Sequence, residues 1–198
     1  MKDAFIARER THFHVTVFCR VLRVAPSGFY ACCQRAQRTA ADITYLPTRQ
    51  RWMYLAVVIH LRTRQVLGYC PDETMNDTLV CRALIDACVA CPAVCGTLLH
   101  SDQGSQYHSQ RFCWLLTAYG LVASMSRRGN CWDNAVVESF FASLKTEEAQ
   151  RPYDSKAHAH QAIACYIHGF YNTTRLHSAL GYRSANAYAR EGQRIIAA

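Results

Sequence analysis

The chain has 198 residues, of which 51% are hydrophobic, so it can bury the core of one ordinary domain with appendages and is not a disordered polymer. Its formal net charge of +8 favours a polyanionic partner such as nucleic acid, although a merely basic soluble protein would carry the same excess. No stretch approaches the roughly 20 apolar residues that cross a bilayer, and charges interrupt the N-terminus, so we expect a cytoplasmic protein with no membrane partner.

The 11 cysteines of a protein in that compartment are expected to be reduced thiols. Cys88, Cys91, Cys95 and His100 have a spacing that is compatible with a zinc site. Cys88, however, continues the apolar stripe of a predicted helix, and His100 ends a predicted strand. Because a tetrahedral site would require both elements to be given up, packing is the favoured interpretation and a zinc module is the weaker alternative.

Residues 1–40 predict a short helical N-terminal segment with a linker. His14–Arg23 has an amphipathic pattern, and Ser27 can cap a second short helix that continues to Tyr30. Two helices with a short turn are typical of part of a helix-turn-helix, but a small packing hairpin is equally compatible with these residues. Residues 34–41 are expected to be the linker.

Three predicted strands come next. Asp42–Leu46 is rich in β-branched and aromatic residues, Trp52–His60 is strongly apolar, and Val66–Cys70 follows a basic turn. Since two tight turns join them, the three strands are expected to be antiparallel neighbours.

The remaining pattern alternates helices with strands. In chain order it predicts a helix capped by Asn76, a strand at Thr97–Ser101, a helix capped by Ser109 and closed by Gly120, a strand at Leu121–Ser126, and helices over 134–148 and 155–171, the last with Ile163, Tyr166, Ile167 and Phe170 facing inward. This order is the connectivity of the RNase H-like fold. We therefore expect an α/β protein with a mixed five-stranded sheet flanked by helices.

Two aspartates fall where such a sheet would present a site. Asp42 lies on the first strand, and Asp102 ends the fourth strand just before Gln103 and Gly104. Aspartate is a poor strand former, so a strand that ends in Asp indicates a site rather than packing. For Asp102 a turn-starting aspartate is an equally good alternative.

The helix over 134–148 carries a third carboxylate. Val137, Phe140, Phe141 and Leu144 give this helix a core face, and Asn134, Glu138, Ala142 and Lys145 form a second face beside it. Glu138 can therefore bind a metal ion while Lys145, two turns along, reaches a DNA phosphate. The alternative is a solvated polar face.

The sequence resembles a known family at many ordered positions. Asp102 and Glu138 are separated by 35 residues, which is the Asp-Asp-35-Glu arrangement of retroviral integrases and related bacterial insertion-sequence transposases. Further matching words, covering about residues 41 to 188, are Ala41–Tyr45, Tyr54–Val58, His100–Tyr107, Ser124–Asn130, Trp132–Ala135, Glu138–Phe141, Leu144–Glu147 and Tyr171–Tyr182.

The resemblance implies a catalytic core over 41–190, with 191–198 as a tail. It implies a transposase or integrase that cleaves DNA strands at element ends and transfers them, with Asp42, Asp102 and Glu138 holding two Mg²⁺ ions, for which Mn²⁺ substitutes. Double-stranded DNA of the element ends and target would be the partner. A homo-oligomer would assemble on this DNA, and an upstream-frame helix-turn-helix protein would be a further partner. The DNA-bound protein would be associated with the bacterial nucleoid.

Within this resemblance Lys145, Asn134, Arg127, Arg128 and Asn130 are the expected DNA contacts. The two arginines are equally well explained as a solvated basic loop. Trp132 either stacks on an unpaired base or packs.

The sequence also departs from the family. A long helical segment that usually precedes the first catalytic strand is missing, so the chain resembles an internally deleted copy. His60 stands where the family usually has Asp, and Ala185 replaces the usual Pro. A catalytically inactive DNA-binding remnant that interferes with intact transposase is therefore the alternative function.

Overall fold

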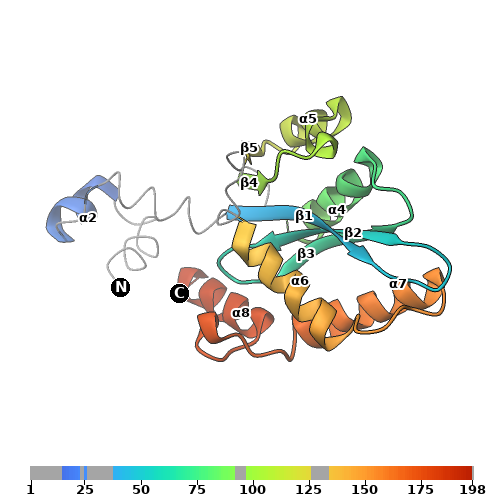
Figure 1. The fold of residues 1–198 in the computed structure, drawn as a ribbon. Helices are drawn as coiled ribbons and strands as arrows, with labels where there is room; N and C mark the ends of the chain where they lie inside the picture. Colours follow the sequence, from blue (N-terminus) through green and yellow to red (C-terminus); the bar gives the residue numbers. More distant parts are fainter. Residues whose placement is uncertain (1–14, 23–24, 26–37, 92–96, 126–133, 198) are drawn as a thin grey trace.

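The computed structural model describes residues 15–22, 25, 38–91, 97–125 and 134–197. Its centre is a mixed five-stranded sheet in the order β3-β2-β1-β4-β5 (Figure 1), with strands β1 Arg38–Leu46, β2 Met53–His60, β3 Val66–Asp72, β4 Leu98–Ser101 and β5 Val122–Met125. The first three strands pair antiparallel, and β4 is parallel to both β1 and β5. The predicted sheet of the RNase H-like fold is confirmed.

Strand β1 begins earlier than the sequence indicated. It starts at Arg38, so the prediction that residues 34–41 form a linker was wrong for 38–41. Thr39 pairs with His60, and Ala40 and Ala41 are buried in the sheet. These small residues carry little strand propensity of their own, and pairing on both sides decides their conformation.

The predicted helices form with the predicted caps. They are α4 Asp77–Ala90, α5 Gln110–Ala118, α6 Ala135–Glu147 and α7 Lys156–Ala164. The side chains of Asn76, Ser109 and Ser155 each accept a hydrogen bond from the backbone N–H three residues further along the chain, as capping residues do.

The N-terminal helix is α2 Val15–Leu22, while the second helix expected near Ser27 lies outside the described residues. Helix α8, Ala185–Ala197, was not predicted and crosses the expected end of the core at residue 190.

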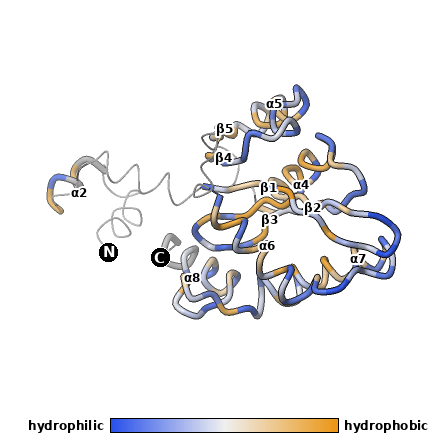
Figure 2. The backbone as a smooth tube through the Cα atoms, in the orientation of Figure 1, coloured by the Kyte–Doolittle hydropathy of each residue, from blue (hydrophilic) through white to orange (hydrophobic). Residues whose placement is uncertain are grey.

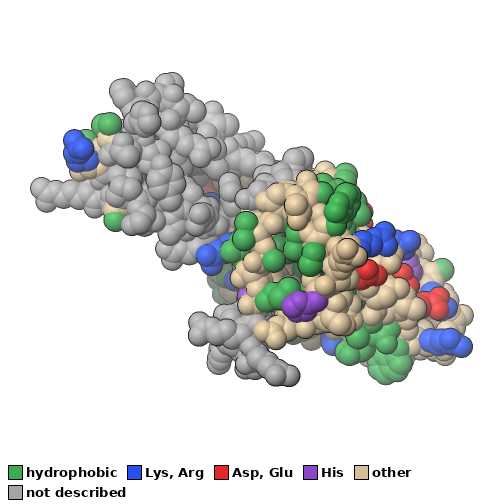
Figure 3. Space-filling model, turned by 90° about the horizontal axis from the view of Figure 1, so that it is seen from above, with side chains coloured by type: hydrophobic (Ala, Val, Ile, Leu, Met, Phe, Trp, Pro, Cys, Tyr) green, Lys and Arg blue, Asp and Glu red, His purple; other side chains and the backbone are tan. Residues whose placement is uncertain are grey.

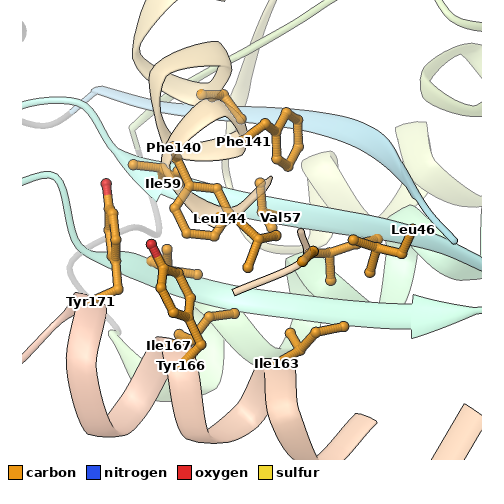
Figure 4. Close-up of a cluster of buried hydrophobic side chains, with 14 of the residues drawn as sticks. Leu46, Val57, Ile59, Phe140, Phe141, Leu144, Ile163, Tyr166, Ile167 and Tyr171 are labelled. Atoms are coloured by element: carbon orange, nitrogen blue, oxygen red, sulfur yellow. The ribbon is translucent and has the colours of Figure 1, made fainter. Parts of the chain in front are cut away.

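Helices cover both faces of the sheet and give it two cores. Helices α4 and α5 pack on one face, and α6 and α7 pack on the other. Figure 2 shows that the central strands between them are mostly hydrophobic. On the second face Phe140 and Leu144 of α6 lie against Val57 and Ile59 of β2 (Figure 4), and all four are fully buried. The core face predicted for α6 is thereby confirmed.

Helix α7 continues as a π-helical segment, Cys165–Tyr171. Ile163, Tyr166 and Ile167 face inward as expected, but Phe170 is 39% exposed and Tyr171 is buried in its place. A π-helix bonds residue i to i+5, as the Asn172 N–H does to the Ile167 carbonyl, and the wider turn shifts the inward face by one residue. The prediction for Phe170 was wrong for this reason.

A buried asparagine closes the outer edge of the sheet at β3. Asn172 Nδ2 donates to the Val66 carbonyl at 2.9 Å, and its Oδ1 accepts the Val66 N–H at 3.0 Å. The amide thus replaces a neighbouring strand for one residue of an edge strand, where unpaired backbone groups invite further pairing. The polypeptide after α7 is attached to the sheet by this pair of bonds.

Figure 3 looks down on the side of the molecule that carries α4, α5 and β5, and hydrophobic side chains are exposed there. The large ones on these elements are Val89 at 73% exposure, Trp114 at 66% and Val122 at 59%. In the described parts of the chain, no helix is both long and apolar enough to span a membrane.

Gly68 on β3 tests how closely α4 packs on the sheet. A Cβ at this position would meet backbone atoms of Ala83 and Ala87 and lie 2.9 Å from the Ala87 Cβ. Because backbone cannot move aside cheaply, Gly68→Ala is expected to lower the free energy of unfolding by about 3 kcal/mol. Urea unfolding followed by circular dichroism measures this.

Gly169→Ala is the matched control, since a Cβ there meets nothing within 4 Å. Its free energy of unfolding should stay within about 1 kcal/mol of the wild-type value. Equal losses in the two variants would contradict the packing argument.

Candidate metal centre

Asp42 lies in the middle of β1, the central strand of the sheet. It pairs with Val57 on the antiparallel side. On the parallel side, the last residue pair between β1 and β4 is Ala40 with His100. Asp42 comes two residues after Ala40, and Asp102 comes two residues after His100. Parallel pairing therefore brings the two aspartates to adjacent positions at the sheet centre.

The chain turns sharply at Asp102, directly after β4. The carboxylate is exposed, and its Oδ1 accepts the Gly104 N–H at 2.9 Å. A Cβ on Gly104 would lie 3.0 Å from that same oxygen, so glycine leaves room beside the carboxylate. The local backbone thus orients Asp102. Asp102 starts a turn, as one interpretation of the sequence expected, and its role as a site residue is compatible with that turn.

Glu138 lies in the first turn of α6 and is exposed. The adjacent residue Val137 is fully buried on the core face of the same helix. Packing of that face fixes the rotation of α6 and directs Glu138 away from the core.

The three carboxylates influence one another electrostatically at Asp42. The pKa of Asp42 is raised from 3.8 to about 6, first by burial and then by the charges of Asp102 and Glu138. The Ile43 N–H, which donates to Asp42 Oδ1 at 2.8 Å, and the side chain of Asn134 act in the opposite direction. Like charges at close range make ionisation of Asp42 costly, and an added cation would relieve that cost.

Two buried polar atoms beside these carboxylates have no hydrogen-bond partner within the described part of the chain. They are the Tyr107 hydroxyl and Asn134 Oδ1. Burial, followed by the charges of Asp42 and Asp102, raises the pKa of Tyr107 well above its usual value. Unsatisfied buried oxygens next to carboxylates are typical of a place where an ion or ordered water completes the bonding.

The donor chemistry fits a hard divalent cation, which prefers carboxylate and other oxygen ligands. The described residues nevertheless contain no ready-made group of three His, Cys, Asp or Glu side chains that could hold a metal ion. Asp42 accepts the Ile43 N–H and Asp102 accepts the Gly104 N–H, so each aspartate is held by the backbone that follows it. The charges of Asp102 and Glu138 act on Asp42, but the three side chains do not form a group that could hold a metal ion in this arrangement.

The expected DNA contacts divide into three groups. Arg127, Arg128 and Asn130, together with Trp132, lie outside the described residues. Lys145 is exposed on α6, and it lines a hollow of about 570 Å³ with Tyr45, Trp52 and Tyr54.

Asn134 differs from the other expected contacts because it is only 5% exposed and its side chain acts on Asp42. Sequence reasoning missed this orienting role and also missed Tyr107. Both residues belong to words that matched the family, so the signal was present without its physical meaning.

The cysteine cluster does not assemble in the described residues. Cys88 is buried in the core face of α4, and His100 Nδ1 lies 3.2 Å from the Ser124 hydroxyl across β4 and β5. Cys95 lies outside the described residues. The packing interpretation of Cys88 is confirmed.

Comparison with known proteins gives family matches along most of the sheet and the helices that follow. A profile described as integrase core domain matches residues 34–131, and a second profile with the same description matches residues 119–184. The transposase for insertion sequence element IS904 of Lactococcus lactis is 40% identical over 150 residues, which cover 75% of this chain and 59% of that protein. Transposase InsF for IS3A of Escherichia coli is 40% identical over 146 residues, covering 73% and 51%. The chain therefore spans little more than half the length of these relatives.

Among solved structures, the HTLV-2 integrase catalytic core domain in complex with magnesium is similar. Its trimeric form superimposes with a TM-score of 0.60 and its dimeric form with 0.57. The trimeric form is 14% identical and covers 77% of this chain and 95% of that one. At this identity the likeness shows the fold alone.

The raised pKa of Asp42 gives a prediction for the metal-free protein. Between pH 3.8 and about 6 the folded state binds more protons than the unfolded state, so the contribution of Asp42 to stability falls as pH rises through this window. Asp42→Asn removes the charge and should raise the free energy of unfolding at neutral pH by on the order of 2 kcal/mol.

Urea unfolding in the presence of a chelator measures this difference at neutral pH and again below pH 3.8, where the gain should vanish. A gain of the same size at both pH values would show that the charge of Asp42 is not its cause.

Proposed function

The chain belongs to the integrase core domain family, and on that premise we propose that it is the catalytic part of an insertion-sequence transposase. It would be a polynucleotidyl transferase that cleaves DNA strands at element ends and joins them to a target. The observation that carries this proposal is the electrostatic convergence of Asp102 and Glu138 on a partly buried Asp42.

Asp42, Asp102 and Glu138 would hold two Mg²⁺ ions, with Mn²⁺ as a substitute. When bound, such ions supply Lewis acidity that activates an oxygen nucleophile and stabilises the leaving oxygen of the phosphodiester. The fit rests on the three carboxylates as oxygen donors and on two unsatisfied buried oxygens beside them, and holding a metal ion would require the carboxylates to draw together.

The residues around the carboxylates prepare them for that role. The Ile43 and Gly104 N–H groups each bind one oxygen of an aspartate, and the other oxygen would serve as the metal ligand. Because the pKa of Asp42 is about 6, this group exchanges its proton near neutral pH, and a cation favours the ionised form.

DNA binding would use cations on α6 and in the segment that precedes it in the sequence. Lys145 is exposed two turns along α6 from Glu138, which suits a phosphate contact. Arg127, Arg128 and Asn130 are proposed contacts in the segment before α6, and Asn134 would serve by orienting Asp42. The net charge of +8 supports a polyanionic substrate.

A homo-oligomer on bacterial nucleoid DNA, with an upstream-frame helix-turn-helix protein, is the proposed assembly. Departures of the sequence from the family pattern, such as His60 where Asp is usual, favour a second candidate. That candidate is an inactive remnant that binds DNA and poisons intact copies. Turnover separates the two candidates, because both would bind DNA.

Cleavage of a labelled native element end in Mg²⁺ tests the enzyme. Asp102→Asn and Glu138→Gln should each lower the rate roughly a thousand-fold or more while DNA affinity changes little. Asp86→Asn, an exposed carboxylate on the opposite helical layer, is the matched control and should cleave like wild type. Cleavage surviving in Asp102→Asn would remove the assignment, and wild-type protein that binds without cleaving would favour the remnant.

A further inference from the structure

A second hollow, of about 210 Å³, lies along a different flank of α6 from Lys145. Ser139 and Ser143 of α6 form one wall, Arg64 comes from the turn between β2 and β3, and Arg175 and His177 come from the segment after the π-helix. Three parts of the chain that are distant in sequence therefore supply its polar groups.

Cations dominate this hollow. Arg175 Nε donates to both carboxylate oxygens of Glu147, at 2.8 and 3.0 Å, and among the described residues its two Nη groups are left able to donate to a ligand. Burial first, and then the Arg175 and Arg64 guanidinium groups, lower the pKa of His177. The charge of Glu147 acts in the opposite direction on the pKa of His177, but Glu147 does not line the hollow, whereas both arginines do.

The turn that carries Arg64 is fixed in place by several bonds. The Arg64 N–H donates to the His60 carbonyl at 2.8 Å, and the Thr63 N–H donates to His60 Nδ1 at 3.1 Å. Arg64 itself has a φ of 63°, a left-handed conformation that Gly or Asn adopts at lower cost. A strained residue that keeps a long cationic side chain indicates a use for that side chain.

The hydrogen-bond donors that line the hollow indicate which kind of ligand it would bind. Guanidinium groups only donate, and their planar fork matches the oxygens of a phosphate. Two serine hydroxyls on the facing wall can add donors. Val136, which precedes Glu138 by two residues, also lines the hollow, so the hollow and Glu138 are reached from the same turn of α6.

We propose that Arg64, Arg175, Ser139 and Ser143 form a binding site for a backbone phosphate of DNA, separate from the carboxylates. The identity of the polyanion rests on the proposed function, while the site itself rests on the hollow and its cations. The site would position the DNA along α6 without reading its sequence, since phosphate contacts fix register and carry no base information.

Fluorescence anisotropy of the full chain with a labelled random-sequence duplex, in chelator and over a series of salt concentrations, tests the site. Arg64→Asn removes the cation and suits the left-handed backbone. It should weaken binding roughly threefold to tenfold and reduce the slope of log affinity against log salt by about one. Arg62→Asn, in the same turn but fully outside the hollow, is the matched control and should keep the wild-type slope.

A second pair of variants tests the opposite wall. Ser143→Asp brings a negative charge into the hollow and should weaken binding, whereas the nearly isosteric Ser143→Asn should bind several times more tightly than the Asp variant. Equal slopes for Arg64→Asn and Arg62→Asn, or equal affinities for the two Ser143 variants, would overturn the site.

Because these measurements contain no divalent metal, they stand apart from the cleavage assay. If the wild-type protein cleaves DNA and Arg64→Asn keeps the wild-type slope of log affinity against log salt, this site is overturned and the proposed function stands. A reduced slope in a protein that never cleaves would leave the site intact and overturn the enzyme.

Discussion

Parallel pairing of β1 with β4 is the constraint on which the candidate site depends. The two strands come from distant parts of the sequence and are joined in space by three recorded residue pairs, which end at Ala40 and His100. Two residues after these positions come Asp42, on β1, and Asp102, just beyond the end of β4. The buried sheet beneath them makes an ionised Asp42 costly, and that cost is also what would make a cation valuable there.

Helix α6 connects this centre with the rest of the molecule through three different faces. Its core face, with Phe140 and Leu144 fully buried, fixes its rotation against β2. That rotation directs Glu138 and Lys145 to one side and Ser139 and Ser143 to another. Hydrophobic packing thus determines where the polar faces point, and a change in the core would disturb both proposed DNA-binding regions.

The segment after the π-helix is attached to the opposite edge of the sheet from β5. Asn172 bonds both backbone groups of Val66, and Arg175 bonds Glu147 near the end of α6. The β2–β3 turn, the end of α6 and the residues around His177 are therefore fixed relative to one another. This explains how residues from three parts of the chain form one basic hollow.

The sequence by itself determined the elements whose signals are local. Hydrophobic spacing and the capping residues Asn76, Ser109 and Ser155 located the helices, and the matched words identified the three carboxylates as candidates. Tertiary structure decided what depends on partners: the early start of β1, the inward turn of Tyr171 in place of Phe170, and the burial of Asn134 beside Asp42. These outcomes follow from strand pairing and packing between distant segments, and no local pattern of residues encodes such contacts.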